Sequence, residues 1–180
     1  KVESYQYVLL NKPKDFITTS KDPQNRKTVM ELVSNACIER IYPVGRLDRN
    51  TLGLLLFTND GMLAEKLTHP RNEINKTYQV EVDQTIQSGH MKMMLEGVEL
   101  EDGFAKVDSI DYADNGTNKS GAVISLHSGR NRIVRRIFEH FDYKIKKLDR
   151  IQFATLDKKG LQRGTWRHLT TEEVGFLKTM

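Results

Sequence analysis

Asp48 lies in a polar turn directly before an apolar run, an arrangement that suits a nucleophile held in a fixed position. Residues 45–61 read Gly-Arg-Leu-Asp-Arg-Asn-Thr-Leu-Gly-Leu-Leu-Leu-Phe-Thr-Asn-Asp-Gly, and the apolar run at 54–57 is typical of a fully buried strand. Residues 42–45 have the composition of a turn. The polar residues 46–51 that follow should therefore form a loop that rests on a packed element. The same pattern also fits a solvated turn residue whose hydrogen bonds merely stabilise the loop.

A second segment, residues 129–139, carries arginines along one side of a predicted helix. The helical spacing places two sets of side chains on separate stripes. The apolar stripe contains Ile133, Val134, Ile137, Phe138 and Phe141, and the polar stripe contains Arg132, Arg135, Arg136 and Glu139. Guanidinium groups form directional pairs with phosphates and carboxylates, so the polar stripe could bind an RNA backbone or keep a catalytic carboxylate ionised. An ordinary amphipathic helix with a charged outer face gives the same pattern.

Positive charge is concentrated in one part of the chain. The whole sequence has 28 basic and 24 acidic residues, a net charge of +4, and a pI near 9.1. Residues 129–167 contain twelve Lys and Arg against four Asp and Glu, a net +8, which leaves −4 for the remainder. A basic surface confined to one part of a chain is typical of proteins that bind a polyphosphate such as RNA. Acidic proteins and lipids are the alternative partners.

Length and composition favour one enzyme-sized domain over residues 1–180. No run of about 18 apolar residues predicts a membrane span, and the first residues lack the apolar region of a signal peptide. The single cysteine, Cys37, excludes an internal disulfide framework and fits a reducing compartment. The histidines lack metal-ligand spacing and there is no Gly-rich phosphate loop, so we expect no metal and no cofactor. We expect a monomeric cytoplasmic protein.

Periodicity and turn signals predict mixed helices and strands. Strands are predicted at 5–11, 54–58, 77–82, 104–112 and 122–127, and helices at 28–36, 60–67, 88–96, 133–139 and after the cap at 170–173. Within 88–96 we expect Met91, Met94 and Leu95 to face the core. Residues 114–121 read as a connector between strands. Strands that follow one another without helices indicate an α+β fold, with a mixed, largely antiparallel sheet and flanking helices.

Three segments resemble motifs of one enzyme family. Residues 45–61 closely resemble the signature of the pseudouridine synthases that act on ribosomal RNA, in which the aspartate matching Asp48 is catalytic. Residues 129–138 resemble the family motif Gly-Arg-Asn-Arg-Gln-Val-Arg-Arg-Met-Phe, but with isoleucine at 133 and 137. Residues 76–80 resemble its Lys-x-Tyr strand. The opening and closing segments also match, so the resemblance covers nearly the whole chain.

The resemblance implies a reaction that needs no cofactor. Uridine within RNA is converted to pseudouridine by cleavage of the glycosidic bond, rotation of the uracil and rejoining through C5. It also implies the synthase catalytic fold with a central RNA-binding cleft, and ribosomal RNA as the partner, the large-subunit RNA first and the small-subunit RNA second. Because a stacked uridine is out of reach of a carboxylate on a protein loop, the base must be flipped out.

Residue roles follow from the matched motif positions. Asp48 would provide covalent catalysis at C1′ of the ribose or C6 of the base, and the sequence does not choose between them. Arg46 would fill the space left by the flipped base, Tyr78 would stack on that base, and Arg135 would pair with the aspartate. The residues expected to contact RNA are Lys12, Arg130, Asn131, Arg132 and Arg136.

Two departures from the family pattern accompany the resemblance. Ile133 replaces a polar glutamine, which removes any contact that the glutamine makes. The small N-terminal RNA-binding module usual in this branch is not expected in a chain that begins almost at the first catalytic strand. The competing hypothesis is a non-catalytic RNA-binding or ribosome-assembly module that kept the fold, although the presence of Asp48, Tyr78 and Arg135 argues against it.

Overall fold

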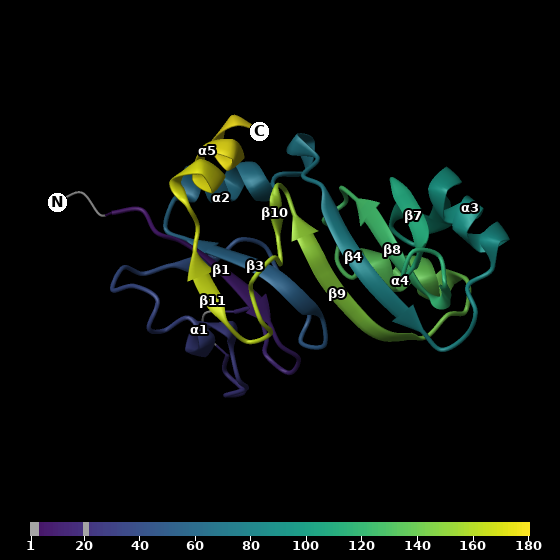
Figure 1. Ribbon diagram of the computed structural model, residues 1–180, viewed down its shortest axis with the longest axis horizontal. Helices are drawn as coiled ribbons and strands as arrows, with labels where there is room; N and C mark the ends of the chain where they lie inside the picture. The colour runs from purple at the N-terminus through teal and green to yellow at the C-terminus, as the bar shows by residue number, and fades with distance from the viewer. Residues whose placement is uncertain (1–3, 20–21) are drawn as a thin grey trace. The chain divides into compact units, whose positions relative to one another are not determined.

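A computed structural model describes residues 4–19 and 22–180, which form two compact units (Figure 1). Unit 1 consists of Lys1–Asn72 and Gln152–Met180, and unit 2 consists of Glu73–Ile151. The chain therefore leaves unit 1 once, forms unit 2 as a continuous segment, and returns. Each unit contains a sheet with helices, as the α+β prediction requires.

Unit 1 is built on antiparallel strands in the order β11–β1–β3. Its strands are β1 (Tyr7–Lys12), β2 (Tyr42–Pro43), β3 (Leu52–Thr58), β10 (Leu156–Asp157) and β11 (Trp166–His168). β1 pairs with β3 over its whole length, with Tyr7 opposite Thr58 and Lys12 opposite Gly53. The predicted apolar strand is confirmed, and all four residues of the run at 54–57 are fully buried. This buried pair of strands is the rigid base on which the loop before β3 rests.

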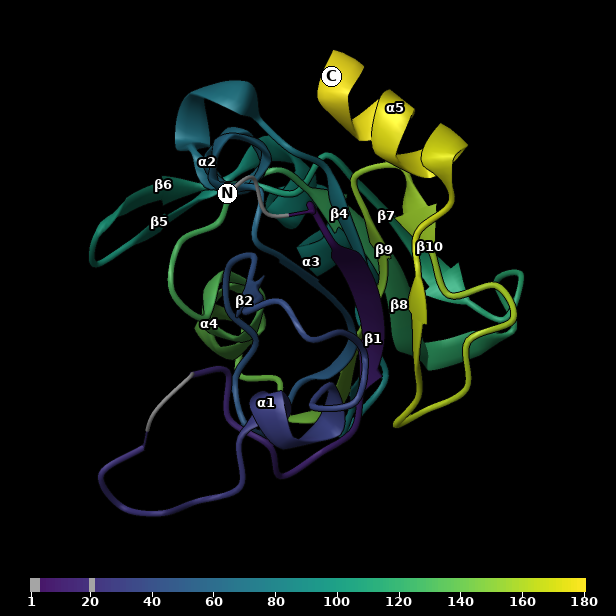
Figure 2. The same cartoon turned by 90° about the vertical axis from the view of Figure 1, so that its left-hand side faces the viewer.

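The helices of unit 1 are α1 (Val29–Leu32), α2 (Gly61–Thr68), the 3₁₀ turn η1 (Pro70–Asn72) and α5 (Thr171–Thr179). Two of them, α2 and α5, begin at side-chain caps. Asp60 caps α2, because its Oδ1 accepts from the Leu63 N–H at 3.2 Å, while its Oδ2 accepts from the Tyr7 hydroxyl at 2.6 Å. Burial and this carboxylate together raise the pKa of Tyr7. Figure 2 shows α1 and α5 toward opposite ends of β1.

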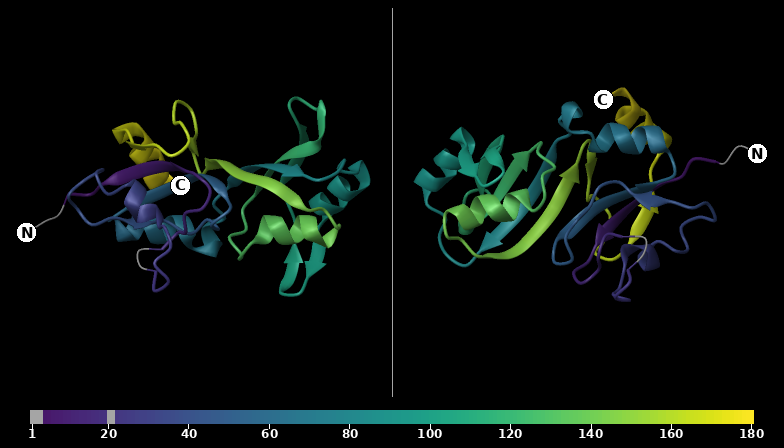
Figure 3. Two further views of the ribbon diagram at one scale, coloured as in Figure 1. Left: turned by 90° about the horizontal axis from the view of Figure 1, so that it is seen from below. Right: turned by 180° about the vertical axis from the view of Figure 1, so that it is seen from behind.

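Within unit 2 the strands are paired in the order β9–β4–β8–β7, and β5 and β6 form a separate two-stranded sheet. The elements are β4 (Lys76–Val82), α3 (Ser88–Glu96), β5 (Val98–Leu100), β6 (Gly103–Ala105), β7 (Ser109–Ala113), β8 (Asn118–Leu126), α4 (Ile133–His140) and β9 (Ile145–Phe153). Figure 3 shows α4 and the β5–β6 hairpin on one side of the β9–β4–β8–β7 sheet and the β7–β8 connection on the other. The core of unit 2 lies between the sheet and its helices.

The core of unit 2 confirms the apolar stripe of α4. Ile133, Val134, Ile137 and Phe138 are all buried there, and the arginines of the helix lie outside it. In α3 the prediction holds for Met91 and Met94, but it is wrong for Leu95, which is 40% exposed. Helical spacing predicts which side chains share one face of a helix. How many of them are buried depends on the elements that pack against that face.

Several element boundaries differ from the predictions, among them that of β8, which begins at Asn118 inside the predicted connector. The strand predicted at 104–112 is two strands, β6 and β7, because the chain leaves the hairpin before it joins the sheet. The helix predicted at 28–36 ends at Leu32, where the chain enters a turn closed by the Ala36 N–H and the Val33 carbonyl. Strands β2, β5, β9, β10 and β11 were not predicted, and β2 lies in the segment predicted as a turn. Among the described residues no helix is both long and apolar enough to cross a bilayer.

Candidate active site

The loop that carries Asp48, residues 46–51, connects β2 to β3 in unit 1. Leu47 is buried and packs in an apolar cluster with Val8, Val29 and Phe57. On either side of it, Arg46 is exposed and Asp48 is partly exposed. The loop therefore presents two charged side chains from either side of one buried anchor.

Lys12 supports this loop through hydrogen bonds to its main chain. Its side chain is fully buried, and its Nζ donates to the main-chain carbonyls of Asp48 (3.1 Å), Arg49 (3.1 Å) and Thr51 (2.7 Å). It also donates to the carbonyl of Pro13 at 3.1 Å. Burial lowers the pKa of Lys12 to about 8, against the opposing attraction of the Asp48 and Asp15 carboxylates. At neutral pH the ammonium supplies charge-assisted hydrogen bonds to consecutive parts of the loop.

The placement of Lys12 corrects its expected role. A contact with RNA requires an exposed cation, whereas this side chain has no exposed surface and is surrounded by carbonyl oxygens of its own chain. The family motif contains this residue, but its hydrogen bonds are made within the chain. Lys12 supports the loop and does not offer a surface for RNA.

Thr18 forms a second fastening of the same loop. Its hydroxyl donates to the Leu47 carbonyl at 2.8 Å and accepts from the Leu47 N–H at 3.2 Å. Nearby, the Asp15 N–H donates to the Arg49 carbonyl at 2.9 Å. Nothing in the sequence singles out Thr18, because its partner lies about thirty residues away and depends on how the segment after β1 folds back.

The other predicted substrate-binding residues lie in unit 2. Tyr78 is on β4, opposite Ile124 of β8, and is only 9% exposed within the core of that unit. Arg135 is partly exposed on α4. Asp48 and Arg46 belong to unit 1, so the expected pairing of Asp48 with Arg135 and the stacking by Tyr78 stay predictions.

Two of the predicted RNA-binding arginines share a carboxylate that the sequence did not point to. Asp102, in the turn of the β5–β6 hairpin, accepts through Oδ1 from Arg136 at 2.6 Å and from Arg130 at 2.7 Å. Arg130 also donates to the Phe104 carbonyl at 2.6 Å. Hydrogen bonds from Arg136 and Arg130 lower the pKa of Asp102 to about 2. Asn131 and Arg132 are exposed, and Arg132 has a left-handed backbone with φ of 52° before α4.

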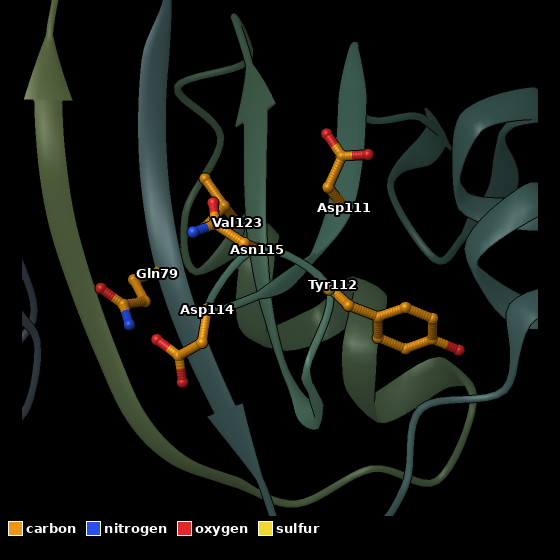
Figure 4. A pocket seen from close by; sticks show the side chains of 7 residues that line it. Gln79, Asp111, Tyr112, Asp114, Asn115 and Val123 are labelled. Atoms are coloured by element: carbon orange, nitrogen blue, oxygen red, sulfur yellow. The ribbon is translucent and has the colours of Figure 1, made fainter.

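An open groove of about 690 Å³ lies on the face of the unit 2 sheet away from α4 (Figure 4). Gln79, Asp111 and Asp114 line it, and the Tyr112 ring points away from Gln79 and Asp114 in Figure 4. The Tyr112 hydroxyl donates instead to the Ile86 carbonyl at 2.6 Å. Two carboxylates repel phosphate, so this groove is not where we place RNA. Nowhere in residues 4–19 and 22–180 do three His, Cys, Asp or Glu side chains gather as a metal site would require.

The fold and the supported aspartate loop agree with one class of RNA-modifying enzyme. The chain belongs to the RNA pseudouridylate synthase family, whose model matches residues 6–140. The matched range contains the loop at 46–51 and the arginines up to Arg136, so both segments singled out from the sequence lie inside it.

Curated relatives carry the same family name. An uncharacterized RNA pseudouridine synthase of Aquifex aeolicus is 39% identical over 98% of this chain and 71% of its own length. The ribosomal large subunit pseudouridine synthase B of Bacillus subtilis is 40% identical over 97% of this chain and 72% of its own length. The protein of the same name from Vibrio vulnificus is 38% identical, and the chain spans only about half (53%) of its length.

Solved structures agree with this assignment. A crystal structure of a pseudouridylate synthase superposes with a TM-score of 0.87 at 25% identity, covering 98% of this chain and 75% of that one. A protein in an H/ACA ribonucleoprotein bound to substrate RNA is similar with a TM-score of 0.58 at 12% identity, a likeness that concerns the fold alone. The α+β fold class and the family are therefore confirmed.

Proposed function

We propose that this chain isomerises a specific uridine to pseudouridine in ribosomal RNA, with large-subunit RNA as the first candidate and small-subunit RNA as the second. The observation that carries the proposal is the family match over residues 6–140, which includes Asp48 on its supported loop. Relatives from Bacillus subtilis and Vibrio vulnificus are named for the large ribosomal subunit. We also propose a monomer that works in the cytoplasm.

Asp48 is the proposed nucleophile. Its carboxylate attacks C1′ of the ribose or C6 of the flipped uracil, the glycosidic bond breaks, and the uracil rotates. C5 then bonds to C1′, the bond between Asp48 and the substrate breaks to return the free carboxylate, the hydrogen at C5 leaves as a proton, and N1 takes up a proton, so no oxidant or activated donor enters the balance. The main-chain support by Lys12 favours this chemistry, since a nucleophile on an unsupported loop would need ordering in each turnover.

The remaining roles rest on motif matches. Arg46, exposed beside Leu47, is proposed to fill the space that the flipped base leaves. Tyr78 is proposed to stack on the base and Arg135 to keep the catalytic carboxylate ionised, and both stay predictions. Among the residues expected to contact RNA backbone, Asn131 and Arg132 are exposed, whereas Arg130 and Arg136 already bond Asp102.

The test uses ribosomal RNA that carries tritium at uridine C5, because rejoining through C5 expels that hydrogen. The wild-type chain should release tritium, and Asp48→Asn should lower release by a factor of roughly 10³ or more while RNA binding stays within about twofold. Asp15→Asn is the matched control. It makes the same change of charge at an exposed position near the loop, where φ of 72° suits asparagine.

Three outcomes of this experiment test the enzyme, the binding module and the role of Asp48. Release by the wild type and by Asp15→Asn, but not by Asp48→Asn, would support both the reaction and the nucleophile. RNA binding without release by any of the three, on large- and small-subunit RNA alike, would favour the non-catalytic module. Turnover retained in Asp48→Asn would remove this residue from the mechanism.

A further inference from the structure

Leu47, in the 46–51 loop, is held through both its side chain and its main chain. Its side chain is 6% exposed in the apolar cluster of unit 1, and both of its main-chain polar groups bond the Thr18 hydroxyl. The Thr18 hydroxyl thus bonds both the N–H and the carbonyl of Leu47, as the main chain of a neighbouring strand would in a sheet. The residue held in this way directly precedes Asp48.

The geometry of the peptide bond transmits this hold to Asp48. The Leu47 carbonyl and the Asp48 N–H belong to one planar peptide unit, which also contains the Asp48 Cα. Because the Thr18 hydroxyl donates to that carbonyl at 2.8 Å, it sets the orientation of the plane before Asp48. Rotation of this plane would swing the Asp48 side chain as a whole.

The plane after Asp48 is fixed independently. The Asp48 carbonyl accepts from the Lys12 ammonium at 3.1 Å and from the Thr51 N–H at 2.9 Å. With the planes on both sides held, the backbone dihedrals of Asp48 are defined and only its side-chain torsions stay adjustable. Thr18 therefore holds the peptide plane before Asp48, whereas Lys12 holds the plane after it.

We propose that Thr18 is a positioning residue, whose hydroxyl aims the Asp48 carboxylate through the peptide bond that joins Leu47 to Asp48. The inference rests on the proposed role of Asp48 as nucleophile. Thr18 touches neither RNA nor reacting atoms in this role, so its removal should slow the chemical step and leave RNA affinity unchanged. A misplacement of about 1 Å at a reacting group can cost roughly a hundredfold in rate.

The test compares Thr18→Val with Thr18→Ser. Valine keeps the shape but removes the hydroxyl, whereas serine keeps the hydroxyl. We expect Thr18→Val to lower kcat for tritium release about tenfold or more, with KM and the RNA dissociation constant within about twofold, and Thr18→Ser to retain most of the wild-type kcat. Thr117→Val is the control, because it also removes one hydroxyl bond to a main-chain carbonyl, that of Asp114 in an exposed turn of unit 2.

A second readout does not depend on turnover. In ¹⁵N relaxation measurements, the Leu47 and Asp48 amides of Thr18→Val should show greater mobility than those of the wild type and of Thr18→Ser. Wild-type inactivity on RNA would overturn the proposed function, and the amides would still decide whether Thr18 restrains the loop. Unchanged amide mobility, an unchanged kcat in Thr18→Val, or an equal loss in Thr18→Ser would each overturn the positioning role.

Discussion

At the scale of single residues, Lys12 shows how a charge can serve a loop without reaching solvent. Its ammonium has three hydrogens and lies within hydrogen-bond distance of four main-chain carbonyls, three of which belong to the loop at 46–51. Loss of its proton leaves two hydrogens and removes the charge assistance. The support of the loop should therefore depend on pH.

Activity should fall as pH rises through about 8, because the folded-state pKa of Lys12 is lowered to about 8. Stability has the opposite sign. Between about 8 and the ordinary value of 10.5, the unfolded chain binds the proton more readily than the folded chain, so this group's contribution to the free energy of unfolding rises with pH. The check is kcat for tritium release against pH, with thermal unfolding measured in the same buffers.

Titration of Lys76 could produce the same alkaline fall in kcat. Burial also lowers the pKa of Lys76 to about 8, with repulsion by Arg150 as the smaller cause. The Lys76→Arg variant removes this titration. If the alkaline fall in kcat persists in Lys76→Arg, Lys12 is responsible. Disappearance of the fall would assign it to Lys76 and remove the support for a pH-dependent loop.

Ile133 is a second single-residue case. The family motif has glutamine at this position, but here the side chain is 5% exposed in the core of unit 2. Ile133→Gln should lower the free energy of unfolding by about 1–3 kcal/mol, because an amide would enter an apolar cluster. Chemical denaturation checks this, with Ile38→Gln at a fully exposed position as the control, for which we expect a change within about 0.5 kcal/mol. Equal stability of the two variants would mean that the site accommodates glutamine, as the motif suggests.

At the scale of elements, the β5–β6 hairpin bonds the arginine segment through the Asp102 side chain and through the main-chain carbonyls of Gly103 and Phe104. The two short strands form their own sheet, and Asp102 in the turn between them bonds Arg130 and Arg136. An isolated two-stranded hairpin has marginal stability in water, so such contacts matter for its position. The carboxylate also occupies guanidinium groups that could otherwise bind phosphate.

Asp102→Asn should therefore strengthen RNA binding and steepen its dependence on salt. Two further phosphate contacts would increase the slope of log K against log salt by up to about 1.4 in magnitude for single-stranded RNA. Glu101→Gln is the matched control, since it removes the same charge from the neighbouring exposed residue. Binding measured over a salt series distinguishes them, and equal slopes for both variants would show that only total charge matters.

Sequence patterns predicted the elements whose signal is local. The buried run of β3, the helix α2 and the apolar stripe of α4 can be predicted from neighbouring residues, and all three are confirmed; either Asn59 or Asp60 could cap α2, and the cap is Asp60. β9 and β11 were not predicted, because their charged residues hide the alternating apolar pattern of a strand. Such a segment is stabilised as a strand by pairing with a neighbour, as β11 does with β1. The candidate site shows the same division. Asp48 and Lys12 stand in motifs, whereas the partners of Thr18 and Asp102 are set by tertiary structure.

At the scale of the whole molecule, the basic segment is less available than its charge suggests. Residues 129–151 lie in unit 2 and residues 152–167 in unit 1, so the segment is divided between the units. Several of its cations have partners within the chain, among them Arg163, which donates to the Asn11 Oδ1 at 2.5 Å, and Arg167, which pairs with Glu173 at 2.7 Å. Arg150 is buried. Charge counted along a sequence does not separate surface cations from those that stabilise the fold.

The order of the chain through the units has a consequence during synthesis on the ribosome. Unit 2 is continuous, so its segment can leave the exit tunnel and fold while unit 1 is still incomplete. Unit 1 needs β11 to pair with β1, and the whole segment of unit 2 separates these two strands in the sequence. The strands beneath the Asp48 loop therefore acquire this partner only after the whole of unit 2 has been synthesised, so a nascent chain stalled before Trp166 would carry Asp48 on an incomplete sheet.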